Sequence, residues 1–160
     1  MNRLSIDGTK TAEKYRLYLD VDGVLLGRAD PTRKRKTVAH GAVDFLSFAK
    51  DKFDCYWLTP HCHGEAAAVR EYIGRHYLNR GDLDYLLTKV KPTIFATPRT
   101  RLFAEGEKFY WLTPEISSEE EEDLESRGRF NNHVQIDTRK DFNALDGARD
   151  FLRKELGLDA

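Results

Sequence analysis

Two carboxylates, Asp20 and Asp22, follow a short hydrophobic run and are the residues of this chain best suited to chemistry. The run Leu17-Tyr18-Leu19 has the length and character of a strand buried on both faces of a parallel sheet. Carboxylates at the end of such a strand are costly to desolvate unless they bind a metal ion or take part in a reaction. Gly23 permits a turn that would give the two carboxylates separate roles. The pattern also fits a turn held by side-chain hydrogen bonds, with no catalytic role.

The segment Asp20-Val21-Asp22-Gly23-Val24-Leu25 resembles the first motif of the haloacid dehalogenase-like superfamily, most of whose members are magnesium-dependent phosphohydrolases. The resemblance implies that Asp20 is a nucleophile that forms an aspartyl-phosphate, and that Asp22 is the general acid and then the general base. It also implies a Mg²⁺ ion held by the Asp20 carboxylate and the Asp22 backbone carbonyl. The chemistry is consistent, because a carboxylate is a weak nucleophile that positioning and a metal ion make effective.

A second hydrophobic run, Tyr56-Trp57-Leu58-Thr59, is similar to the second motif of the same superfamily, a strand that ends in Ser or Thr. The resemblance implies that the Thr59 hydroxyl hydrogen-bonds the phosphoryl group. We expect Pro60, Gly23 and Lys91 to contribute to the same phosphate-binding site.

The third and fourth motifs depart from the superfamily pattern. Arg99 lies where these relatives keep a lysine that steadies the phosphoaspartate, and Lys89 and Lys91 are alternatives. Small capless relatives read Trp-Leu-Asp-Asp where this chain has Trp111-Leu112-Thr113-Pro114, so the two acids that complete the magnesium site are missing. Mg²⁺ prefers octahedral oxygen coordination with one or two carboxylates, and this loss weakens the expected site. Glu115 could replace them through a water molecule, or it is simply an exposed loop residue.

Three further clusters have a plausible functional and a plausible structural interpretation. His61-Cys62-His63 follows Thr59, and we favour a histidine that lines the phosphate pocket over a metal site, because no second ligand cluster accompanies it. The basic stretch 33–36 is typical of a solvated face, yet in the loop after Asp22 it could attract an anionic substrate. The acidic stretch 119–123 is interpreted as an exposed helix start.

Hydrophobic periodicity predicts strands and helices in alternation, which is typical of a parallel sheet covered on both faces. The sequence therefore predicts an α/β three-layer Rossmann-like sandwich with a mostly parallel sheet and little or no cap. Asp20, Thr59 and Thr113 are expected at the carboxyl ends of strands, where such sheets bind ligands. The predicted strands span residues 17–19, 54–58, 93–95, 109–112 and 134–136, and the predicted helices 40–51, 64–77, 82–88, 118–127 and 145–156.

The chain has 160 residues and a net charge of −1, so one domain over residues 15–160 is expected, preceded by a loosely held tail over 1–14. The balanced charge does not call for a nucleic-acid partner. Cys55 and Cys62 are too few for a disulfide framework, and no apolar run could cross a membrane. We expect a cytoplasmic protein.

Two functions remain open from the sequence, of which a weak hydrolase is the leading hypothesis and a binding protein the alternative. The first is a phosphomonoesterase that uses Asp20, Asp22, Thr59 and Arg99 with Mg²⁺, and for which Glu115 is the remaining candidate metal ligand. The second is an inactive pseudophosphatase that binds a phosphorylated ligand or a partner. A site without a large cap admits large substrates, which favours a phosphate on a macromolecule or a nucleic-acid end.

Overall fold

The centre of the protein is a four-stranded sheet in which every strand runs parallel to its neighbours. The structure is a computed structural model that describes residues 3–4, 10–11, 14–28, 30–32 and 35–158. Leu19, in the middle of the sheet, lies opposite Trp57 on one side and Leu112 on the other. The strands lie in the order β6 (Asp54–Trp57), β3 (Arg16–Leu19), β7 (Phe109–Thr113) and β8 (His133–Gln135).

Side chains alternate between the two faces of this sheet, as the period of a strand requires. Leu17, Leu19 and Leu112 belong to the larger hydrophobic core on one face. Tyr18 and Trp111 belong to a smaller, aromatic core on the other. A strand with both faces buried explains why the sequence around residues 17–19 is apolar without interruption.

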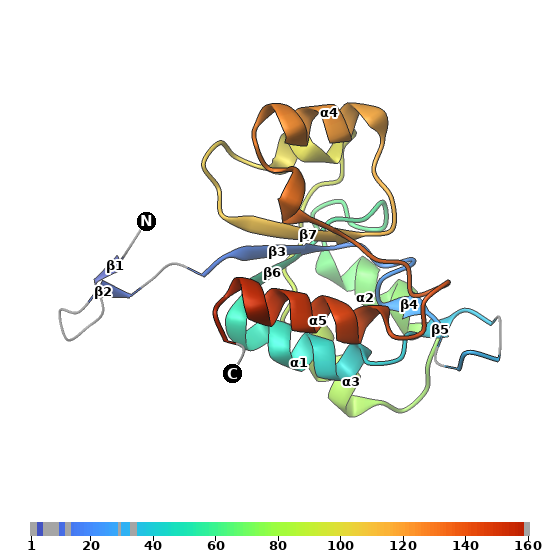
Figure 1. Cartoon of the computed structure of the whole chain (residues 1–160). Helices are drawn as coiled ribbons and strands as arrows, with labels where there is room; N and C mark the ends of the chain where they lie inside the picture. Colours follow the sequence, from blue (N-terminus) through green and yellow to red (C-terminus); the bar gives the residue numbers. More distant parts are fainter. Residues whose placement is uncertain (1–2, 5–9, 12–13, 29, 33–34, 159–160) are drawn as a thin grey trace.

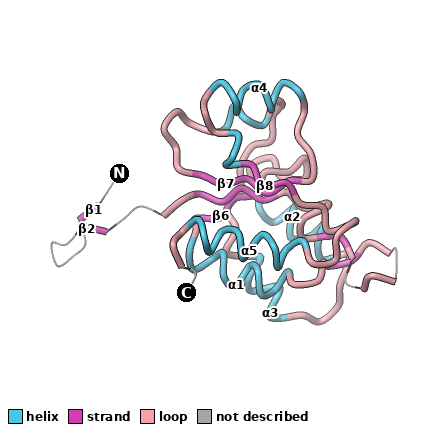
Figure 2. Tube along the Cα trace, viewed as in Figure 1, coloured by secondary structure: helices cyan, strands magenta, loops and turns pink. Residues whose placement is uncertain are grey.

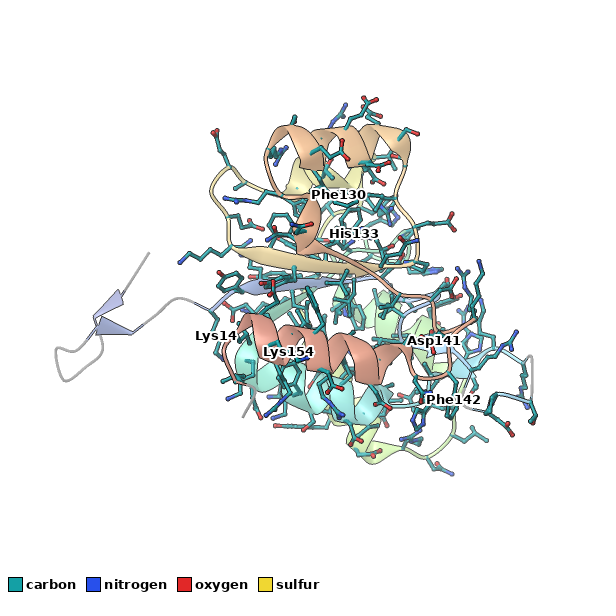
Figure 3. The ribbon with its side chains drawn as sticks, viewed as in Figure 1. Lys14, Phe130, His133, Asp141, Phe142 and Lys154 are labelled. Carbon is teal, nitrogen blue, oxygen red and sulfur yellow. The ribbon has the colours of Figure 1, made fainter. Side chains whose placement is uncertain are left out.

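Helices cover both faces, and this gives three layers (Figure 1). The larger core is covered by α1 (Ala42–Lys52), α2 (Ala66–Gly74), α3 (Gly81–Leu87) and α5 (Ala144–Glu155). The aromatic core is covered by α4 (Ser118–Ser126) with the 3₁₀ turn η1 (Arg99–Leu102). A second 3₁₀ turn, η2 (Phe130–Asn132), leads into β8. Figure 3 shows Phe130 and His133 on the α4 side and Lys154 and Phe142 on the α5 side. The predicted α/β, Rossmann-like layout is confirmed.

The sheet has a position at which the chain leaves neighbouring strands toward opposite faces (Figure 2). The chain continues from β3 to α1 beneath the sheet and from β7 to α4 above it. Ligands of such folds bind beyond the carboxyl ends of strands, at this kind of crevice. The Asp20 N–H donates to the Leu112 carbonyl at 3.1 Å, so Asp20 and Thr113 are neighbours there.

Two small antiparallel pairs were not predicted. β4 (Leu26–Gly27) pairs with β5 (Thr37–Val38) just beyond the carboxyl end of β3. β1 (Arg3–Leu4) pairs with β2 (Lys10–Thr11), away from the main sheet. The rest of the predicted tail, apart from Lys14, lies outside the described residues, so its loose attachment stays a prediction.

The predicted edge strand over residues 93–95 is wrong. Ile94 makes one isolated antiparallel bridge to His63, and the Phe95 N–H donates to the Cys62 carbonyl. These bonds fasten the segment to the loop after β6, so it does not extend the sheet. The last strand was predicted one residue too late in the chain.

Neither cysteine forms a disulfide, and both are buried. No helix in the described residues has the length and apolar character needed to cross a membrane.

Candidate functional site

Asp20 is the first residue after β3, and its side chain is 13% exposed. Its Oδ1 accepts the Val21 N–H at 2.8 Å, and its Oδ2 accepts the Thr113 hydroxyl at 3.1 Å. Burial raises the pKa of the Asp20 carboxyl, although the Val21 N–H, the Arg99 guanidinium and the Thr113 hydroxyl oppose this. Both carboxylate oxygens therefore already have donors from the protein.

Arg99 lies beside Asp20, with Nη1 3.7 Å from Asp20 Oδ2. Its side chain is only 12% exposed, and its guanidinium lies over the Trp111 ring. Nε and Nη2 donate to the two carboxylate oxygens of Glu120, each at 2.9 Å, and Nη1 donates to the Thr113 hydroxyl. This bidentate geometry fixes the guanidinium next to Asp20.

Glu120 was not predicted to have this role, and the interpretation of residues 119–123 as exposed is wrong at this position. Its side chain is 3% exposed. Besides Arg99, it accepts the Ser117 N–H in a capping box at the start of α4. Burial alone would raise its pKa, but the hydrogen bonds from Arg99 and the Ser117 N–H outweigh burial and lower the pKa to about 2. The spacing Ser117-x-x-Glu120 was the sequence signal that could have revealed it.

Thr113 and Pro114 occupy the positions where the resemblance placed two acids. Thr113 contributes its hydroxyl to Asp20. The Pro114 ring packs so closely on Gly23 that a Cβ atom there would overlap it, and Arg139 also lies within 3.2 Å of that Cβ position. Gly23 has φ of +81°, which favours glycine independently of this contact.

Asp22 points into a separate polar cluster, which we call the Asp22 network: Asp22, Lys36, His61 and Tyr72. Lys36 Nζ and the Tyr72 hydroxyl donate to Oδ1 at 3.1 and 2.9 Å, and His61 Nε2 donates to Oδ2 at 3.1 Å. The His61 and Tyr72 rings stack with centroids 3.7 Å apart. Burial would raise the pKa of Asp22, but the hydrogen bonds from His61, Tyr72 and Lys36 hold it below its ordinary value.

Thr59 lies at the carboxyl end of β6, at the same edge of the sheet as Asp20, and is fully buried. Its hydroxyl accepts the His61 N–H at 3.4 Å, and its carbonyl accepts the Cys62 N–H at 3.0 Å. These bonds form the turn that brings His61 to Asp22. Pro60, in this turn, is exposed.

Two of the candidate residues do not join this group. Lys91 pairs through its backbone with Cys55 and Trp57, and its Nζ lies over the Tyr56 ring. It lines a cavity with Lys14, which Figure 3 places at the amino end of the sheet, so its prediction as a phosphate ligand is wrong. The Glu115 side chain is exposed, and its part in the site is a backbone carbonyl that accepts from Arg99 Nη2 at 2.9 Å.

The three residues His61, Cys62 and His63 diverge in the structure. His61 binds Asp22, whereas the Cys62 thiol lies 3.2 Å from the Thr93 carbonyl and the His63 ring contacts Phe95 edge-on. Within the described part of the chain, no set of three or more His, Cys, Asp or Glu side chains is arranged to hold a metal ion.

The donor set does not fit Mg²⁺. The Asp20 oxygen next to the missing acids accepts a hydroxyl hydrogen bond and has a guanidinium 3.7 Å away. The second acid position is a proline ring, and the Glu115 carboxylate is not grouped with Asp20 and Asp22. A divalent cation would have to displace fixed protein donors and accept a neighbouring positive charge, and both are unfavourable.

Comparison with known proteins identifies no relative: no family model matches this chain, and neither does a curated protein or a solved structure.

Proposed function

We propose that this protein is a haloacid dehalogenase-like pseudophosphatase that binds a phosphorylated ligand at the carboxyl edge of its sheet without a metal ion. The observation that carries the proposal is the state of the two carboxylates. Asp20 is held by Thr113 beside Arg99, and Asp22 is held by Lys36, His61 and Tyr72.

Asp22 is poorly suited to the general-acid role that the resemblance implies. A general acid must carry a proton that it can give to the leaving group, and its pKa should lie near the working pH. Three donors engage both oxygens of Asp22 and lower its pKa, so it stays ionised at neutral pH. In this proposal Asp22 is a positioning residue, which holds Lys36 and His61 at the opening of the site.

The ligand phosphate would meet donors rather than a metal. Lys36 donates to Asp22 and to the Tyr72 hydroxyl, and its side chain is 44% exposed, so its third N–H group can donate to an anion. The His61 side chain, which is 32% exposed, lies beside Lys36 on the same carboxylate. Thr59 is fully buried and contributes through the turn that positions His61. Asp20 would oppose an anion when ionised, and its raised pKa eases protonation when phosphate binds.

Titration with inorganic phosphate and phenyl phosphate, in EDTA and in excess Mg²⁺, tests the proposal. We expect equal affinities in both buffers and no hydrolysis of phenyl phosphate. Lys36→Ala should weaken phosphate binding about tenfold, because it removes a charge-assisted hydrogen bond. Lys52→Ala, at an exposed lysine in the last turn of α1, is the matched control and should bind as the wild type does.

Asp20→Asn separates the two candidate functions. In a binding protein this change removes a like charge and should tighten phosphate binding. In a hydrolase it should abolish turnover, because an amide cannot form the acyl phosphate. Magnesium-dependent hydrolysis by the wild type that disappears in Asp20→Asn would overturn the proposal and identify a phosphomonoesterase.

A further inference from the structure

A cavity of about 630 Å³ opens beside the Asp22 network, at the carboxyl end of α2. We call it the α2 cavity; its lining includes Arg35, Gly74, Arg75, His76, Tyr77 and Leu78. Small-molecule sites have volumes of roughly 300 to 1,000 Å³ and combine apolar walls with a few polar groups. The size and the lining both fit this description.

The α2 cavity adjoins the proposed phosphate site at two points. The Tyr72 hydroxyl binds Asp22 on one side, and the Tyr72 ring contacts the His76 ring edge-on at 5.6 Å on the other. Lys36, which binds Asp22, is followed by Thr37, whose hydroxyl donates to the His76 carbonyl at 3.4 Å. One ligand could therefore reach both places.

The lining of the α2 cavity offers surfaces on which a flat ring can stack. Arg35 and Arg75 offer guanidinium planes, on which flat rings stack. Asp30 also lines the cavity, where its Oδ1 accepts from the Thr32 N–H and hydroxyl, and the negative end of the α2 dipole points the same way. Leu78 is 86% exposed and adds an apolar wall.

We infer that the α2 cavity holds the nucleoside of a nucleotide whose phosphoryl group lies at Lys36 and His61. The heterocycle of the nucleoside is a flat ring that can stack on Arg35 and Arg75 and pack against Leu78. The N–H groups of the heterocycle can donate to the Asp30 carboxylate and to the negative carboxyl end of α2. This inference names the ligand class of the proposed pseudophosphatase and rests on that function.

The test compares four probes by calorimetry: adenosine 5′-monophosphate (AMP), ribose 5-phosphate, adenosine and inorganic phosphate, with GMP, CMP and UMP to cover the other bases. We expect at least one nucleotide to bind ten times more tightly than ribose 5-phosphate. Equal affinities for ribose 5-phosphate and all four nucleotides would overturn the inference while leaving phosphate binding intact. If adenosine binds but neither inorganic phosphate nor ribose 5-phosphate does, the proposed function fails instead.

Gly74→Leu tests the location. Gly74 lines the α2 cavity, and a Cβ atom there meets no heavy atom within 4 Å, so the larger side chain fills the cavity without a clash. Gly147→Leu is the matched control, because Gly147 lies in α5 with the same open space and lines no cavity described above. Leucine has a higher helix propensity than glycine, so both variants should fold.

Gly74→Leu should abolish the tenfold preference for the nucleotide and leave the affinity for inorganic phosphate unchanged. Gly147→Leu should keep both. Arg75→Ala is a second variant with little structural cost, since Arg75 makes only a 3.4 Å surface pair with Glu71, and it should reduce the preference. A preference that survives both cavity variants would place the nucleoside elsewhere and overturn the inference. Binding of a single-stranded oligonucleotide more than a hundredfold tighter than AMP would overturn the assignment to a mononucleotide.

Discussion

Glu120→Gln should be among the most destabilising conservative substitutions in this protein. The variant keeps the shape of the side chain but removes the bidentate ionic partner of the buried Arg99 guanidinium, which leaves only the longer 3.7 Å pair with Asp20 among its described ionic partners. Removal of one member of a buried pair typically costs about 3–5 kcal/mol. The pKa of Glu120 gives a comparable figure, since a fall from 4.5 to about 2 corresponds to about 3 kcal/mol in favour of the ionised form.

The pH dependence provides a second, independent readout. A carboxyl whose pKa is lowered in the folded state stabilises the protein above its unfolded pKa, and this stability is lost as the pH falls through the folded value. For Glu120 the window runs from pH 4.5 down to about 2. The difference in unfolding free energy between wild type and Glu120→Gln should have its largest value at pH 7 and should become smaller as the pH falls through this window. Urea unfolding at several pH values measures it.

Glu121→Gln is the matched control, because Glu121 lies in the same helical turn and is exposed. It should change the unfolding free energy by less than about 0.5 kcal/mol. A Glu120→Gln variant within about 1 kcal/mol of the wild type at pH 7 would refute the buried pair. It would also remove the reason that Arg99 is fixed beside Asp20.

Three further outcomes follow from local geometry. Gly23→Ala should lower the unfolding free energy by about 1–3 kcal/mol, because φ is +81° and the new Cβ overlaps Pro114; Pro114→Ala should recover part of this loss in a urea titration. Ser117→Ala should cost about 1 kcal/mol and lower the melting temperature, through loss of the α4 cap. Asp22→Asn should be less stable than wild type at pH 7, and the difference should narrow below about pH 4, because the folded-state pKa of Asp22 is lowered; a difference independent of pH would contradict the role of His61 as its partner.

The elements of the fold were predictable because periodicity marks buried faces. The apolar stretch around Leu17 and the stretch that begins at Phe109 are strands with both faces covered, and the 3.6-residue pattern of α5 follows its buried positions, Leu145 and Leu152 among them. A segment that is held by isolated hydrogen bonds leaves no periodic pattern in the sequence. The segment around Ile94 contains β-favouring residues, but a single bridge and two loop bonds determine its structure.

Predictability in the site depended on whether a residue lies at the end of a strand. Asp20 and Thr59 lie at strand ends, and strand ends in a parallel sheet meet at one edge, so their proximity could be predicted. Tyr72 could not be identified in this way, because it lies within a helix whose pattern explains it as a partly buried core residue. Lys91 was predicted at the wrong end of the sheet. Its position in the sequence does not reveal at which end of β6 the segment after α3 meets that strand.

The differences between the carboxyl edge of this sheet and the pattern that the resemblance implies are connected by charge. Two carboxylates at a strand end need compensating positive charge, which a divalent cation can provide. Here Arg99 lies 3.7 Å from Asp20, and Lys36 lies 3.1 Å from Asp22. With those cations fixed in the protein, two more acids at positions 113 and 114 would have added unpaired negative charge. Thr113 instead contributes a hydroxyl donor, and Pro114 fills the space against Gly23. The residues at positions 113 and 114 and the buried Arg99–Glu120 pair are therefore parts of one arrangement, in which the protein supplies the positive charge itself.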